Sequence, residues 1–323
     1  MMHQALKSIE ALLSRRWVNY SLILTGVGLA LVVIGNTVYR NWPEFQAFSW
    51  QLSPLPLIGA GATLVVAFGL NVLTWYLISR AFGSRIGLWK DLEIYSLSTV
   101  IRRVPGVIWQ LAGRTYLYHQ TQTTLAVPLW GTLWEIVVQL SSGILLTALM
   151  LVLSPRLRAE FPGGMWVLLL LIPIGWFALR PHDVVSVMKR IAPKMTGEPN
   201  PTRRDVSAWI GLYVLSWILG GGILYFLICA LGPQTWTLFP VCVGLVAASG
   251  VLAILAAPIP GGLGIREISL MLLLQLYVHN PVAVAAAIML RLWLLLGEAL
   301  IALLTFLVIR GGAWLIQMEH NTP

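Results

Sequence analysis

The sequence predicts an all-α polytopic membrane protein, and three observations lead to this class. Hydrophobic residues make up 58% of the 323 positions and charged residues only 10%, whereas soluble domains carry roughly 25% charged residues. Mean hydropathy is +0.82. Apolar stretches of about 20 residues, the length that crosses a bilayer, recur along the chain. This composition excludes a soluble enzyme and a disordered protein.

The basic balance does not indicate a nucleic-acid partner. The net charge is +9, but Lys and Arg are scattered between long apolar runs. A nucleic-acid reader instead presents a basic stripe interleaved with aromatic side chains. In a membrane protein the basic residues mainly report orientation. We therefore expect no nucleic-acid partner.

We expect one transmembrane domain over residues 18–310, with about seven to eight membrane-spanning helices. It is preceded by an interfacial head at 1–17, which is either a short surface helix or a frayed terminus, and followed by a tail at 311–323. No soluble domain is predicted. The spans are expected near 18–38, 56–79, 125–153, 164–180, 207–231, 236–257 and 282–309.

Lys and Arg counts predict the orientation. The head carries Lys7, Arg15 and Arg16, while the loop after the first span carries only Arg40. The polar linker 181–206 is also rich in basic residues. Because cytoplasmic loops carry an excess of Lys and Arg, we expect a multi-pass protein of the cell membrane with a cytoplasmic N-terminus and linker.

Two segments do not fit simple spans. Residues 87–119 are amphipathic and are interrupted by Pro105 and Gly106. Residues 258–279 begin with a cluster of helix breakers and continue as a short apolar helix. Broken backbone at membrane depth survives only when it is buried in protein or lines a cavity, so the sequence predicts two re-entrant hairpins. The breakers of the second segment are Pro260, Gly261, Gly262 and Gly264.

The two hairpins also indicate an internal repeat. Aligning Pro105 with Pro260 gives an offset of 260 − 105 = 155, which places four elements of each half in register. The first repeat covers about 56–153 and the second about 207–309. Their first spans should cross the membrane in opposite directions, so we expect an inverted repeat. Interrupted helices at matching positions of two halves are a pointer to a transporter binding site.

Two ionisable residues lie deep in apolar spans. Glu135 falls in 125–153 and Arg291 in 282–309, and the offset of 155 places Glu135 on position 290, beside Arg291. A charge at the bilayer centre costs roughly 2.5–3.5 kcal/mol on insertion scales, and a close pair recovers about 4 kcal/mol at an effective dielectric near 20. Pairing could therefore offset one such penalty but not two. We expect Glu135 and Arg291 either to line a polar cavity that meets a charged headgroup or carries a proton, or to form a buried structural salt bridge.

Further charged residues surround the breaks. Arg114 and Arg266, together with free N–H groups of the helices that follow the breaks, would suit an anionic phosphate. Glu267 is either a helix cap or a chemical group. No metal or cofactor is expected, because the sequence shows no metal-ligand spacing and no nucleotide-binding glycine loop.

The stretches PIPGGLGIREISLMLLLQL and AAAIMLRLWLLLGEAL resemble the C-terminal signature of the lysylphosphatidylglycerol synthase transmembrane-region family, also called flippase-like membrane proteins. In that family a Pro-Gly-Gly-x-Gly-x-x-Glu stretch precedes a span with an arginine, here Glu267 and Arg291. The first half, PGVIWQLAGR, keeps Arg114 but has Trp109 and Gln110 where the family more often has Gly and Glu.

The resemblance implies two facing re-entrant hairpins and the movement of a phospholipid, glycolipid or polyprenyl-linked lipid between leaflets. Arg114, Glu135, Arg266, Glu267 and Arg291 would contact the lipid headgroup. A membrane-embedded transferase with Glu267 or Glu135 as general base, or a non-catalytic subunit that joins enzymes of a glycolipid pathway, are the alternatives. Aminoacylation of lipids is not expected, because the sequence shows no soluble transferase domain after this region.

Overall fold

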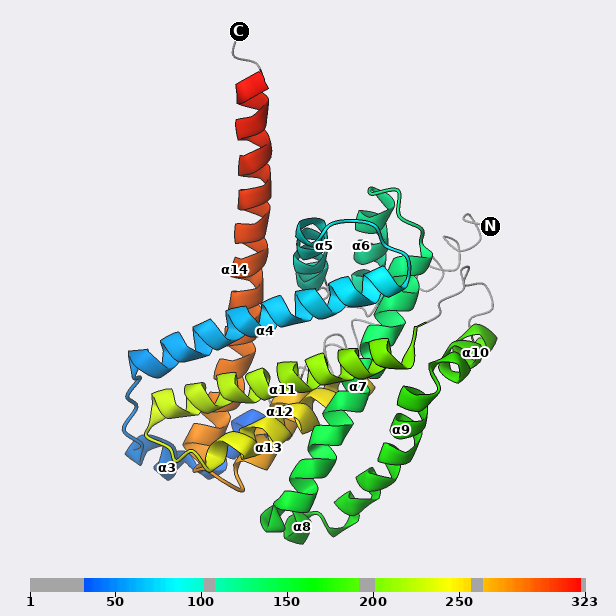
Figure 1. The fold of residues 1–323 in the computed structure, drawn as a ribbon. Helices are drawn as coiled ribbons and strands as arrows, with labels where there is room; N and C mark the ends of the chain where they lie inside the picture. Colours follow the sequence, from blue (N-terminus) through cyan, green and yellow to red (C-terminus); the bar gives the residue numbers. More distant parts are fainter. Residues whose placement is uncertain (1–31, 102–107, 192–200, 257–263, 321–323) are drawn as a thin grey trace.

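The computed structural model describes residues 32–101, 108–191, 201–256 and 264–320, and every secondary-structure element within these ranges is helical (Figure 1). The elements are α3 (Trp42–Ala47), α4 (Pro54–Ala81), α5 (Leu88–Ile101), α6 (Ile108–His119), α7 (Ala126–Leu153), α8 (Pro155–Glu160), the 3₁₀ helix η1 (Pro162–Leu170), α9 (Leu171–Leu179), α10 (Pro181–Ile191), α11 (Arg203–Leu231), α12 (Leu238–Leu255), α13 (Ile265–Leu274) and α14 (Asn280–His320).

Five described helices are long and apolar enough to cross a bilayer: α4, α7, α11, α12 and the Asn280–Val308 part of α14. They lie where the sequence predicts spans, so the expectation of a polytopic all-α membrane protein is confirmed. The predicted span at 18–38 lies largely outside the described residues. The described residues 32–40 are helical.

The span expected at 164–180 differs from a straight helix. The stretch Pro162–Trp176 is followed by Pro181–Val187 at a bend of 98°, and only if this bent pair is one span does the number of candidate spans rise to six. Proline explains the bend, because Pro181 lacks the N–H needed to continue α9 and is suited to begin a new helix. The predicted linker 181–206 therefore opens with helix α10, whose Val184 and Val185 are buried.

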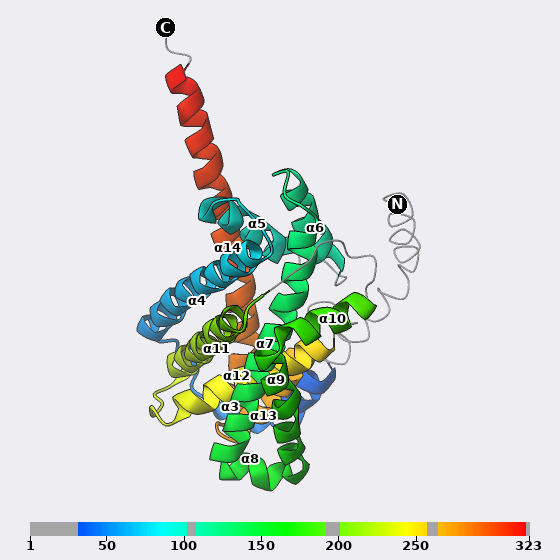
Figure 2. The ribbon, with the colours of Figure 1, turned by 45° about the vertical axis from the view of Figure 1, so that its right-hand side comes forward.

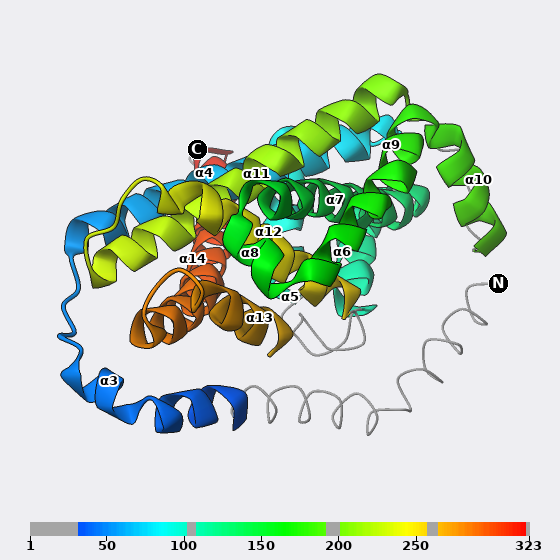
Figure 3. The ribbon, with the colours of Figure 1, turned by 90° about the horizontal axis from the view of Figure 1, so that it is seen from below.

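The core is built on the contact of α11 with α4 and α12. In Figures 1 and 3, α4 and α11 lie side by side and run in opposite directions. Small residues allow the close approach: a Cβ on Gly221 of α11 would lie 2.5 Å from the Cα atom of Val243 on α12. Helices in membranes associate through such small-residue contacts, because lipid supplies no hydrophobic driving force between them.

The order of elements after α10 repeats the order before α8. Each half has a long helix, a second helix, a short helix and another long helix: α4 to α7, then α11 to α14. In Figures 1 and 2, α7 and α14 run in opposite directions, as α4 and α11 do. An inverted repeat would produce this arrangement, and the repeat itself stays a prediction.

The two broken segments each fold as a pair of packed helices. α5 packs on α6 in the first half and α12 packs on α13 in the second, while α14 contacts both α5 and α13. The breaks themselves, with Pro105, Gly106, Pro260, Gly261 and Gly262, lie outside the described residues. Gly264 is described and has φ 86°, a left-handed conformation that favours glycine.

We predict that Gly221→Ala destabilises the fold whereas Gly211→Ala does not. The added methyl group at 221 meets the backbone of α12, and such overpacking typically costs about 1–3 kcal/mol. Gly211 lies on the same helix, and a Cβ added there would meet no neighbouring side chain or helix within 4 Å, which makes it the matched control. Thermal unfolding in detergent should show a lower Tm for Gly221→Ala only; equal Tm values for both variants would contradict the packing described.

Candidate functional site

The first buried ion pair joins Arg114 of α6 to Glu135 of α7. Arg114 Nη1 lies 2.6 Å from Glu135 Oε2 and 3.3 Å from the hydroxyl of Thr132. Arg114 Nε donates to Ser98 Oγ of α5 at 3.4 Å, and Tyr213 of α11 donates to Glu135 Oε1 at 3.0 Å. The pair thus binds four helices of the bundle together.

Aromatic rings cover the face of the Arg114 guanidinium. Its Cζ lies 3.7 Å from the ring centroid of Trp75 and 5.2 Å from that of Tyr95, at cation–π distance. The side chain is fully buried, and Nη2 has no hydrogen-bond partner within the described ranges. A buried donor without an acceptor is costly, so this site has capacity for one more polar group.

A buried aspartate, Asp91, extends the first cluster. Its carboxylate accepts hydrogen bonds from the hydroxyls of Tyr118 and Ser79, and Trp75 Nε1 donates to the Tyr118 hydroxyl at 2.8 Å. Asp91 lies in the first turn of α5, which is not a candidate span, and burial raises the pKa of its carboxyl group. Trp75 therefore links the two groups: its ring lies against Arg114, and its Nε1 donates to Tyr118, which in turn donates to Asp91.

Nothing in the sequence singles out Asp91. It stands between Lys90 and Glu93 in the sequence. Lys90 Nζ lies 2.6 Å from Glu93 Oε2, and these side chains form an ordinary pair at the protein surface. A charged segment of this kind is expected to be solvated. One sequence feature could have indicated that Asp91 is buried. Residues 87–119 are amphipathic, so a helix in this segment has a buried face although it also carries charges.

The second buried ion pair joins Glu267 of α13 to Arg291 of α14. Glu267 Oε1 lies 3.2 Å from Arg291 Nε, with the two side chains 11% and 13% exposed. Glu267 Oε2 accepts the backbone N–H of Gly264 at 2.9 Å, which is the helix cap expected as one alternative. Within the described part of the chain, neither Oε1 nor Nε makes a hydrogen bond of good geometry.

A small cavity of about 10 Å³ adjoins this second pair, lined by Arg266, Glu267 and Arg291 together with apolar residues of α13 and α14. About one water-sized sphere fits such a volume. The structure thus brings three of the predicted site residues together here. Across the described residues, no group of three His, Cys, Asp or Glu side chains could hold a metal ion.

The salt bridge between Glu135 and Arg291, expected as one alternative, is wrong. Each charge meets a partner from its own half, because α6 packs on α7 and α13 packs on α14. The two pairs have opposite polarity: the short helix after the break supplies the arginine in the first half and the glutamate in the second. Glu135 and Arg291 still occupy nearly equivalent positions, since 135 + 155 = 290.

The fold and these pairs define a class: a polytopic α-helical membrane protein in which a short helix of each half, α6 or α13, carries one partner of a buried ion pair. The sequence matches the family model "Lysylphosphatidylglycerol synthase TM region" over residues 20–302. The chain therefore belongs to this family, and the resemblance noted in the sequence is confirmed. The family suggests a function related to membrane lipids. No curated protein matches the chain.

We predict that Arg114 and Glu135 are energetically coupled and that Glu135 and Arg291 are not. Removing one partner of a buried pair costs about 3–5 kcal/mol, because the other charge stays buried. In a double-mutant cycle with glutamine substitutions, Arg114→Gln and Glu135→Gln should therefore show a coupling energy of about 0.5–3 kcal/mol.

The measurement is the free energy of unfolding in detergent for single and double variants. The cycle through Glu135→Gln and Arg291→Gln serves as the control and should be additive within about 0.5 kcal/mol. The pairing would be contradicted if the Glu135 and Arg291 substitutions were coupled while the free-energy changes of the Arg114 and Glu135 substitutions were additive.

Proposed function

We propose that the protein moves a polar or anionic lipid between the leaflets of the cell membrane, along a path that passes the two ion pairs behind the helix breaks. The observation that supports this most is the incomplete hydrogen bonding of both pairs. Arg114 Nη2 in the first half, and Glu267 Oε1 and Arg291 Nε in the second, have no hydrogen-bond partner within the described residues.

The chemistry of the pairs suits a phosphate-bearing headgroup. An arginine that is paired with a carboxylate can exchange that carboxylate for a phosphate, since guanidinium binds both in the same planar geometry. The empty pair is neutral, which limits the cost of its charges in the membrane. When a phosphate replaces the carboxylate on the arginine, the displaced carboxylate has to take up a proton for the site to stay neutral. Because the two pairs have opposite polarity, the short helix α6 carries an arginine and the short helix α13 carries a glutamate.

The family supports a lipid as cargo, because it suggests a membrane-lipid-related function. In our proposal the two broken segments are re-entrant hairpins that shield the headgroup while the acyl chains stay in the bilayer. The N-terminus lies in the cytoplasm, as the excess of Lys and Arg in the head and the linker favours.

We predict that Glu267→Gln and Arg291→Gln abolish most lipid movement. Arg291→Gln removes the charged donor that binds the phosphate, an interaction of about 1.5–3 kcal/mol. Glu267→Gln removes the carboxylate that exchanges with the phosphate, so either change should lower the rate about tenfold or more. The measurement is leaflet exchange of fluorescent phosphatidylglycerol and of a fluorescent glycolipid in liposomes that contain the purified protein, with extraction and mass analysis of the lipids afterwards.

Glu160→Gln and Arg158→Gln are the matched controls, because both residues are exposed on α8, away from the ion pairs. They should leave the exchange rate unchanged. The proposal fails if the wild-type protein exchanges neither lipid. Recovery of chemically altered lipids would instead indicate a membrane-embedded transferase.

A further inference from the structure

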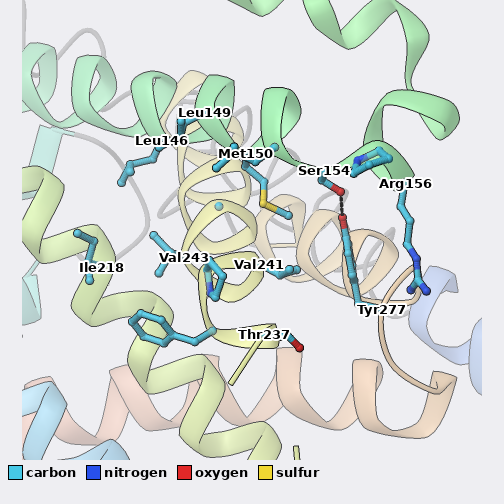
Figure 4. Close-up of a pocket in the computed structure, with 15 residues that line it drawn as sticks. Leu146, Leu149, Met150, Ser154, Arg156, Ile218, Thr237, Val241, Val243 and Tyr277 are labelled. Carbon is cyan, nitrogen blue, oxygen red and sulfur yellow. Dashed lines mark hydrogen bonds between the residues drawn. The ribbon is translucent and has the colours of Figure 1, made fainter. Parts of the chain in front are cut away.

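A separate cavity lies at one end of the bundle, where α7 ends and α12 begins. Its volume is about 560 Å³, within the roughly 300–1,000 Å³ of typical ligand sites. Figure 4 shows its lining side chains. Among its lining residues on α7, Leu146 is nearest to Glu135 of the first ion pair. The two are 146 − 135 = 11 residues apart, or about 16 Å along a helix. Its lining also contains none of Arg266, Glu267 and Arg291, so the cavity is separate from both ion pairs.

The walls of this cavity are apolar. Leu146 and Met150 of α7 face Val243 of α12, with Ile218 of α11 on a third side (Figure 4). Gly244 lets α7 approach closely, since a Cβ there would lie 2.4 Å from Met150 Cγ. Leu149 on the same wall is 51% exposed, so the cavity opens at the surface of the bundle. Because α7 and α12 are candidate spans, that surface faces acyl chains.

The end of the cavity near α8 is polar. Ser154 and Tyr277 share a hydrogen bond there, and Arg156 lies beside the Tyr277 ring at 5.9 Å from its centroid (Figure 4). Arg156 Nη1 donates to the carbonyl of Leu276 at 3.2 Å. Within the described residues this is the one hydrogen bond of the Arg156 side chain, which has five N–H donors. An exposed cation thus stands at the mouth of an apolar groove.

We propose that this cavity binds one anionic phospholipid, with an acyl chain between α7 and α12 and the phosphate on Arg156. The ends of two candidate spans meet here, so the polar end lies at the level of the lipid headgroups whichever way the protein is oriented. The cation complements a phosphate, and the hydroxyls of Ser154 and Tyr277 add hydrogen-bonding groups. Binding at this site does not require that the protein transport lipid.

The test is native mass spectrometry of the full chain in detergent with dioleoyl phosphatidylglycerol or dioleoyl phosphatidylcholine. Arg156→Gln should lower the retained phosphatidylglycerol about fivefold, the effect expected of one arginine near a headgroup, and leave phosphatidylcholine unchanged. Arg158→Gln, on the same exposed helix but not in the cavity lining, is the control. Glycerol 3-phosphate, which lacks acyl chains, should not compete.

A second pair of variants tests the apolar wall. Leu149→Trp fills the groove and should lower retention of both lipids, whereas Leu303→Trp, at a residue 53% exposed on α14, should lower neither. In the wild-type protein, phosphatidylglycerol with a photoreactive acyl chain should label residues 146–153 or 238–244. Equal losses for Arg156→Gln and Arg158→Gln, or labels exclusively outside these segments, would overturn the site; these results are independent of any transport rate.

Discussion

A charged side chain inside a membrane domain has to be neutralised by a neighbour, and this constraint organises both halves of the protein. Each half packs a short helix against the span that follows it, α6 on α7 and α13 on α14. The contact carries an ion pair, Arg114 with Glu135 and Glu267 with Arg291. Tyr213 of α11 also bonds Glu135, so the first pair ties the two halves together.

The pairs differ in how completely they are satisfied. Arg114 is fully buried between aromatic rings and bonds three side chains, which favours a fixed structure. Glu267 and Arg291 meet at 3.2 Å without good hydrogen-bond geometry and adjoin a small cavity. The second pair therefore costs less to open, and in our proposal it is the first to meet a lipid headgroup.

The sequence predicts the long spans well and the charge pairing poorly. α4, α7, α11 and α12 begin and end within a few residues of the expected bounds, because apolar length alone defines them. Glu135 and Arg291 stand out for the same reason. Their partners depend on which short helix packs on which span. The position of a charge within its apolar run does not predict that packing. Asp91 is hidden because its neighbours Lys90 and Glu93 are typical of a solvated helix face.

A charge reversal within the second half tests most directly whether each half pairs its own charges. Arg291→Glu places two carboxylates together and Glu267→Arg places two guanidinium groups together, so each single variant should lose stability. The double variant Glu267→Arg, Arg291→Glu restores an opposite pair with the polarity of the first half. Thermal unfolding in detergent should show most of the lost Tm recovered in the double variant. A double variant no more stable than the worse of the two singles would contradict the account.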